Sequence, residues 1–117
     1  MHAAAVRFEL FVPESGSLKA KRAAIRPIVD ALRHRMKVSV AEVDHQDTWQ
    51  RAAIAVALVA PTDGRLREML ASVDRLVANA PDIELLDTET VWLDADPPAA
   101  GRSGSGPAES AVSWGEV

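Results

Sequence analysis

Residues whose side chains could perform chemistry are concentrated in one short segment, Asp44-His45-Gln46-Asp47. Two carboxylates and an imidazole supply oxygen and nitrogen atoms that could bind a metal ion or transfer protons. Their spacing matches no motif of known mechanism, and a calcium-binding loop requires more ligands and a glycine at its turn. Aspartate is also common in turns, because its side chain accepts hydrogen bonds from nearby backbone N–H groups. We therefore favour a capped turn that binds no metal, with His45 in solvent.

The rest of the sequence lacks known catalytic motifs. It contains no cysteine, which excludes disulfides, thiol catalysis and cysteine-based zinc sites. It also contains no P-loop, no GxGxxG, no GxSxG and no pair of histidines at metal-binding spacing. The histidines are His2, His34 and His45, which we expect in a disordered start, a helix and a turn. A non-enzymatic protein without a cofactor is favoured, and an enzyme that uses residues 44–47 is kept as an alternative.

Basic residues cluster in the segment from Lys19 to Lys37. This segment holds seven basic residues and one acid, Asp30, whereas the chain as a whole has a formal net charge of −4. At about 100° per residue, most of them fall within roughly 60° of one helix face. A nucleic-acid backbone could lie along such a row. The other interpretation is a solvated flank whose aliphatic stems cover the edge of the core.

The hairpin that follows adds aromatic and polar candidates. Trp49 could stack on a base, although an aromatic residue that covers the edge of the core is the favoured interpretation. The candidate residues for contact with RNA or another partner are Lys19, Lys21, Arg22, Arg26, Arg33, Lys37, Gln46, Trp49 and Arg51.

Hydrophobic periodicity predicts the elements that position these residues. Ala5–Val12 alternates apolar and polar residues, which predicts a strand with one buried face. Ser17 is a suitable helix cap, and apolar residues at helical spacing continue from Leu18 to Met36. Pro27 lies inside this helix and is expected to bend it, because it removes a backbone hydrogen bond.

The second half of the chain repeats the strand and helix pattern. Val38–Val43 and Gln50–Ala60 read as the two strands of a hairpin, and Thr62 or Asp63 caps a second helix that ends at Asn79. Ile83–Leu93 is a final strand. Residues 95–117 are rich in Pro, Gly and Ser and contain an isolated Trp114, so we expect a disordered tail after one domain of residues 1–94.

The order β-α-β-β-α-β is typical of the α+β ferredoxin-like fold, a four-stranded antiparallel sheet with two helices on one face. The other face of the sheet is left open. It is predicted to be more apolar than a solvated surface, which favours a homo-oligomer, most simply a dimer, or a protein partner. The residues predicted on this face are Phe11, Ala53, Ala55, Ala57, Leu86 and Trp92.

Two motifs resemble those of a known family. Ser17–Arg22 resembles SLKxKR, and residues 39–52 resemble SVAEV-x-x-QD-x-WQRA. In this order and spacing they are similar to the YlxP-like family, a bacterial domain of unknown function numbered 503, over Ala3–Leu93. Pro27 departs from the ordinary helix former expected there. The resemblance implies a ferredoxin-like fold, and it carries over no catalytic residue because none is established for the family.

The resemblance also bears on function. The family's genes often lie beside those for translation initiation factor 2 and ribosome-binding factor A, which implies a link to translation or ribosome maturation. We therefore expect an accessory protein that contacts RNA, the ribosome or a protein, with a small-molecule-sensing regulatory module as the alternative. The N-terminus does not resemble a signal peptide, and the longest apolar run is much shorter than the roughly 20 residues of a membrane helix. A cytoplasmic location without membrane contact is expected.

Overall fold

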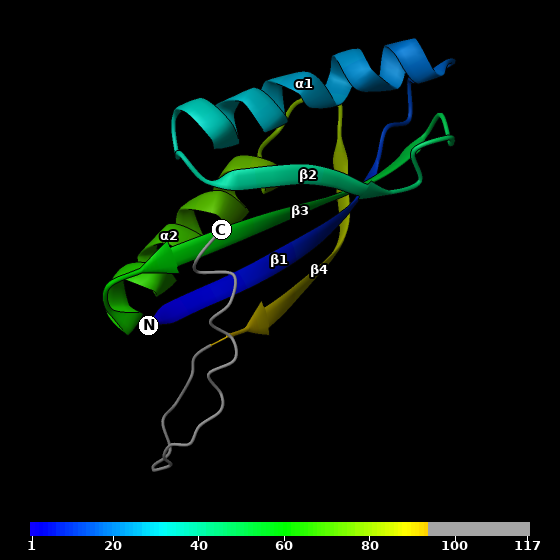
Figure 1. Ribbon diagram of the computed structural model, residues 1–117. Helices are drawn as coiled ribbons and strands as arrows, with labels where there is room; N and C mark the ends of the chain where they lie inside the picture. The colour runs from blue at the N-terminus through cyan, green and yellow to red at the C-terminus, as the bar shows by residue number, and fades with distance from the viewer. Residues whose placement is uncertain (94–117) are drawn as a thin grey trace, which may run out of the picture.

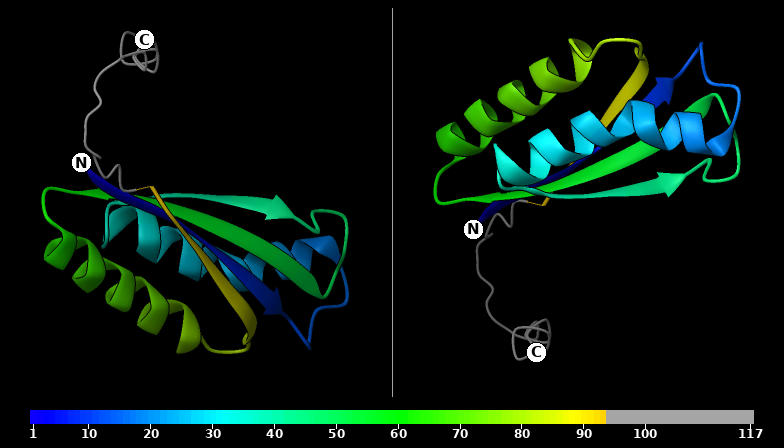
Figure 2. Two further views of the ribbon diagram at one scale, coloured as in Figure 1. Left: turned by 90° about the horizontal axis from the view of Figure 1, so that it is seen from below. Right: turned by 90° about the horizontal axis from the view of Figure 1, so that it is seen from above.

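The computed structural model describes residues 1–93. Its strands form one antiparallel sheet in the order β2-β3-β1-β4, and both helices cover the same face of that sheet (Figures 1 and 2). This arrangement confirms the predicted ferredoxin-like fold. The elements are β1 (His2–Phe11), α1 (Leu18–His34), β2 (Ser39–Asp44), β3 (Arg51–Ala60), α2 (Asp63–Ala78) and β4 (Glu84–Trp92). The tail expected at residues 95–117, including Trp114, lies outside the described residues.

The two helices begin at the predicted caps. Ser17 Oγ accepts a hydrogen bond from the backbone N–H of Ala20 at 3.0 Å, and Thr62 Oγ1 accepts one from the N–H of Arg65 at 3.1 Å. Each bond satisfies a first-turn donor that has no partner within the helix. Helix α1 continues through Pro27, which is exposed. A proline on the outer side of a helix is tolerated because water can reach the carbonyl that loses its partner.

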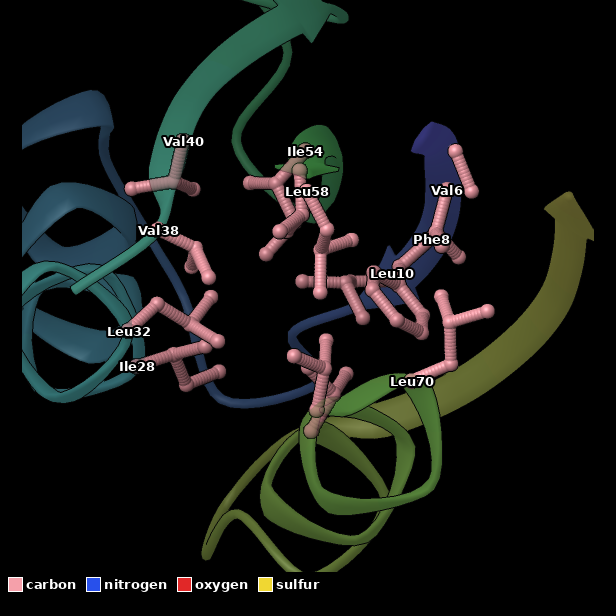
Figure 3. Close-up of a cluster of buried hydrophobic side chains, with 14 of the residues drawn as sticks. Val6, Phe8, Leu10, Ile28, Leu32, Val38, Val40, Ile54, Leu58 and Leu70 are labelled. Atoms are coloured by element: carbon pink, nitrogen blue, oxygen red, sulfur yellow. The ribbon is translucent and has the colours of Figure 1, made fainter. Parts of the chain in front are cut away.

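The core lies between the sheet and the two helices (Figure 3). Alternate residues of the central strands β1 and β3 point into it, and α1 and α2 add residues at helical spacing. Phe8 is completely buried. Burial of one such side chain stabilises the fold by about 1.5–3 kcal/mol. The residues labelled in the figure are Val6, Phe8, Leu10, Ile28, Leu32, Val38, Val40, Ile54, Leu58 and Leu70.

Strand β1 begins earlier than predicted. It starts at His2 rather than at Ala5, and Ala3 and Ala4 are buried opposite residues of β3. Alanine carries little strand signal, so the hydrophobic pattern alone did not extend the strand into this segment. His2 is thus part of the sheet and not of a disordered start.

A bulge at Leu86 reverses the alternation of β4. Leu85 before the bulge and Trp92 after it both pair with core-facing residues of β1 and therefore face the helices. The Arg67 guanidinium of α2 lies over the Trp92 ring, with its central carbon 4.7 Å from the ring centroid. The prediction that Trp92 lies on the open face is therefore wrong, because one extra residue moves all later side chains to the other side. Val91 occupies the open face instead.

Candidate functional site

Lys21 is predicted from the sequence as a contact residue, but the structure buries its side chain completely. Its ammonium Nζ donates to Glu42 Oε2 at 3.0 Å, to the carbonyl oxygen of His45 at 2.7 Å and to that of Arg51 at 3.2 Å. A buried charge requires such partners because it has lost its hydration. Lys21 thus fastens α1 to both ends of the β2–β3 connection, and it is not available to RNA.

An ionic cluster occupies the open sheet face near the same connection. Its members, named here the Glu9 cluster, are Arg7, Glu9, Asp44, His45 and Arg51. The Glu9 side chain is only 11% exposed, and its carboxylate contacts Arg7 Nη1 at 3.0 Å, His45 Nε2 at 2.6 Å and Arg51 Nη2. Arg7 Nη2 also lies 3.3 Å from Asp44 Oδ2. Arg51, a predicted contact residue, is therefore already paired.

The pKa values of the two carboxylates follow from these contacts. Burial raises the pKa of Glu9, but the hydrogen bond from Arg51 and the interactions with the His45 imidazole outweigh burial and lower it. The pKa of Asp44 is lowered by the hydrogen bond from the backbone N–H of His45 and by the charges of His45 and Arg7. Carboxylates that are held in the ionised form are poor proton donors. The cluster is thus better suited to fixing the hairpin than to acid catalysis.

His45 is fixed from both sides of the sheet. Its backbone has a φ of 60°, the left-handed conformation, and its N–H donates to Asp44 Oδ1 at 2.8 Å, so the predicted aspartate-capped turn is present. The expectation that His45 lies in solvent is wrong, because its imidazole contacts Glu9 and its side chain is 29% exposed. Lys21 holds its carbonyl group from the helix side.

The basic row of α1 faces outward. Lys19, Arg22 and Arg26 are exposed, and none of them forms an ion pair with a carboxylate of residues 1–93. Arg33 continues the row, and its Nη2 donates to the carbonyl of Val40 in the edge strand β2 at 3.2 Å. Lys37 is exposed beyond the end of the helix. We refer to Lys19, Arg22, Arg26 and Arg33 as the basic row.

Trp49 lies outside the two strands of the hairpin. Its side chain is 55% exposed, so it does not cover the core as the favoured interpretation expects. It lines a shallow hollow of about 580 Å³ together with Ser15 and Gly16, which precede α1. Gln46 is nearby in sequence, and its Nε2 donates to the carbonyl of Glu42 at 3.3 Å. The exposed indole and the start of the basic row therefore lie at the same end of the molecule.

The far half of the open sheet face is lined by small side chains. Ala55 and Ala57 border a shallow hollow of about 250 Å³, as predicted for residues on this face. Ala53 pairs with Glu9 and is completely buried, so it is unavailable to a partner. Phe11 is half-buried, and Leu86 is 45% exposed at the β4 bulge.

Sequence comparison assigns the chain to a family. The model of a family described as proteins of unknown function, DUF503, matches residues 3–90. The uncharacterized protein YlxP of Bacillus subtilis (strain 168) is 33% identical over 85 residues, which cover 73% of this chain and 92% of that protein. The solution NMR structure of a de novo designed protein with a ferredoxin fold covers 90% of this chain and 96% of its own, at 7% identity and a TM-score of 0.42.

Residues 1–93 contain no helix that is both long and apolar enough to span a membrane. The family match covers both motifs, the one that begins α1 and the one that forms the β2–β3 connection. Within these motifs lie Lys21 and its partners Glu42, His45 and Arg51, so the buried ion pair joins the two most recognisable segments of the sequence. The chain belongs to the DUF503 family of proteins of unknown function.

Proposed function

We propose that this protein is a non-enzymatic accessory protein that binds single-stranded RNA through the basic row of α1. The observation that carries the proposal is the row itself: exposed cations, three of which have no carboxylate partner among residues 1–93. Unpaired surface cations gain affinity for a polyanion by releasing its condensed counterions. Asp30 is the one acidic residue within α1, so the helix carries an excess of positive charge.

The dimensions of the row suit an extended strand. From Lys19 to Arg33 the helix rises about 21 Å at roughly 1.5 Å per residue, long enough to meet several successive phosphates. Trp49 stands beside the start of the row and exposes its indole, on which an unpaired base could stack. A single strand could therefore place its backbone on α1 and one base on Trp49. The gene neighbourhood implied by the family resemblance favours ribosomal RNA.

The test is a titration of labelled single-stranded RNA followed by fluorescence anisotropy over a salt series. The double substitution R22E/R26E should weaken binding by at least about tenfold and lower the slope of log K against log salt by about 1.4, since each phosphate contact contributes about 0.7. R67E on α2, on the flank that faces Trp92, is the control and should weaken binding less than R22E or R26E alone. If R22E/R26E binds like the unmodified protein, if R67E weakens binding as much as R22E, or if binding does not depend on salt, the proposal is wrong.

Self-association through the far half of the open sheet face is a second proposal. The hollow beside Ala57 is flat and bordered by small residues, and Val59 and Val91 are 69% and 52% exposed on the same face. A second copy of the chain supplies an equally flat apolar surface, and a two-fold axis closes the contact. Sedimentation equilibrium should show a dimer that Ala57→Glu dissociates and Ala71→Glu on α2 does not. A monomer at all concentrations would contradict this.

A further inference from the structure

The helices α1 and α2 lie next to each other in the helix layer (Figure 2). Residues at the C-terminal end of α1 and on the side of α2 line a groove between them. It consists of two adjoining hollows of about 250 and 430 Å³, and both are lined by Arg35, Met36 and Ser72. Arg35 caps the end of α1, whereas Ser72 belongs to the middle of α2. Two elements that are distant in sequence thus form opposite walls. The remaining lining residues are Val38, Arg65, Met69, Val73, Arg75, Leu76 and Asn79.

The groove has an excess of positive charge. Arg35, Arg65 and Arg75 line it, and no aspartate or glutamate does. Within residues 1–93, Arg35 forms no ion pair, and the side-chain hydrogen bond of Arg75 goes to Ser72 Oγ at 3.3 Å, a neutral partner. Arg65 pairs with Glu68 at 3.3 Å, but both side chains are more than half exposed. Such a surface pair is weak, so its guanidinium can turn toward a stronger anion.

Part of the groove lining is apolar. Met36 comes from the segment after α1 and Met69 from α2, and methionine side chains adapt to ligands of different shapes. An anion alone would leave these side chains uncovered. The volume and the two kinds of surface together suit a small molecule with one anionic end and one planar or apolar body.

We propose that the groove binds a phosphomonoester of the nucleoside monophosphate class. Arg35 and Arg75 hold the phosphate through paired N–H donors, the geometry at which guanidinium groups bind phosphate best. The base or another planar body rests on Met36 and Met69. This site is separate from the basic row, and it does not rest on the RNA-binding proposal.

The experiment is an NMR titration of the full chain with nucleoside monophosphates, with inorganic phosphate and with the corresponding nucleosides. Nucleoside monophosphates should shift the backbone signals that border the groove at millimolar or lower concentration, and nucleosides and phosphate should each bind more weakly. R35A and R75A should each raise the Kd by about tenfold, because each removes hydrogen bonds to a charged group. Arg67→Ala, on the flank of α2 that faces Trp92, is the control and should leave the Kd unchanged.

Circular dichroism spectra of the variants establish that each is folded. Arg35→Lys and Arg75→Lys keep the charge but lose the paired donors, so they should bind less tightly than the unmodified protein and more tightly than the alanine variants. If nucleoside monophosphates shift no groove signals at millimolar concentration, or if R67A weakens binding as much as R35A, the groove is not such a site.

Discussion

Replacement of Lys21 by methionine should destabilise the fold more than any surface substitution in α1. The ammonium is 0% exposed and makes three hydrogen bonds, and its partner Glu42 is 21% exposed. Removal of one member of a buried ion pair costs about 3–5 kcal/mol. Because water can partly reach Glu42, the lower end applies, and we expect a loss of about 3 kcal/mol. This is a large share of the roughly 5–15 kcal/mol that stabilises a typical domain.

Urea unfolding followed by circular dichroism measures this loss directly. At about 4 °C per kcal/mol, the Tm should fall by about 12 °C. Lys19→Met is the matched control, since Lys19 is exposed two residues away on the same helix, and it should change the free energy of unfolding by less than about 0.5 kcal/mol.

A double substitution separates the ion pair from the rest of the site. K21M/E42L removes both charges and should be more stable than K21M alone, because the unpaired carboxylate is gone. It should not recover fully, since the carbonyls of His45 and Arg51 still lack their donor. Equal stability of K21M and K19M would refute the reasoning.

Three further predictions concern other parts of the fold. Because its cationic partners outweigh burial and lower the pKa of Glu9, the stability contributed by this carboxylate is complete above about pH 4.3 and is lost as the pH falls toward the folded-state pKa. E9Q should therefore be less stable than the unmodified protein at neutral pH, and it should lose less stability than that protein as the pH falls. Urea midpoints measured over a pH series test this. If the midpoints of the two proteins fell in parallel in acid, the prediction would be wrong. P27A should raise the urea midpoint by restoring a helix hydrogen bond, and a lower midpoint would show that the proline sets the path of α1. R67M should cost about 0.5–1 kcal/mol, because it removes the contact with Trp92 and the exposed ion pair with Asp63. The double variant W92A/R67M, compared with the two single variants, should show that Arg67 and Trp92 are coupled.

The elements of the fold could be predicted because periodicity and caps act locally. The stripe Ile25, Ile28 and Leu32 specifies the buried side of α1, and all three residues are buried. Lys21 precedes Ile25 by four residues and Ile28 by seven, which places it on the same side of the helix. The helical spacing therefore already indicated that Lys21 is buried, whereas the count of basic residues concealed it.

The Glu9 cluster and the β4 bulge could not be predicted in the same way. Glu9 meets Arg51 only because β1 and β3 pair in one register, and no local pattern specifies that register. The extra residue Leu86 follows Leu85, so two apolar residues are adjacent in sequence. The pattern therefore does not show which of the two faces the core. A strand pattern therefore gives the faces correctly only up to the first bulge.

The burial of Lys21 has a consequence for the order in which the chain assembles. If α1 packed on the sheet before the β2–β3 connection had closed, it would place an ammonium without partners in an apolar interior. The contacts of Lys21 span up to 30 residues, so they form only when distant segments have met. Helix docking and hairpin closure are thus one cooperative step. An exposed loop usually opens with little cost, but this one should exchange its amide hydrogens at rates close to those of global unfolding.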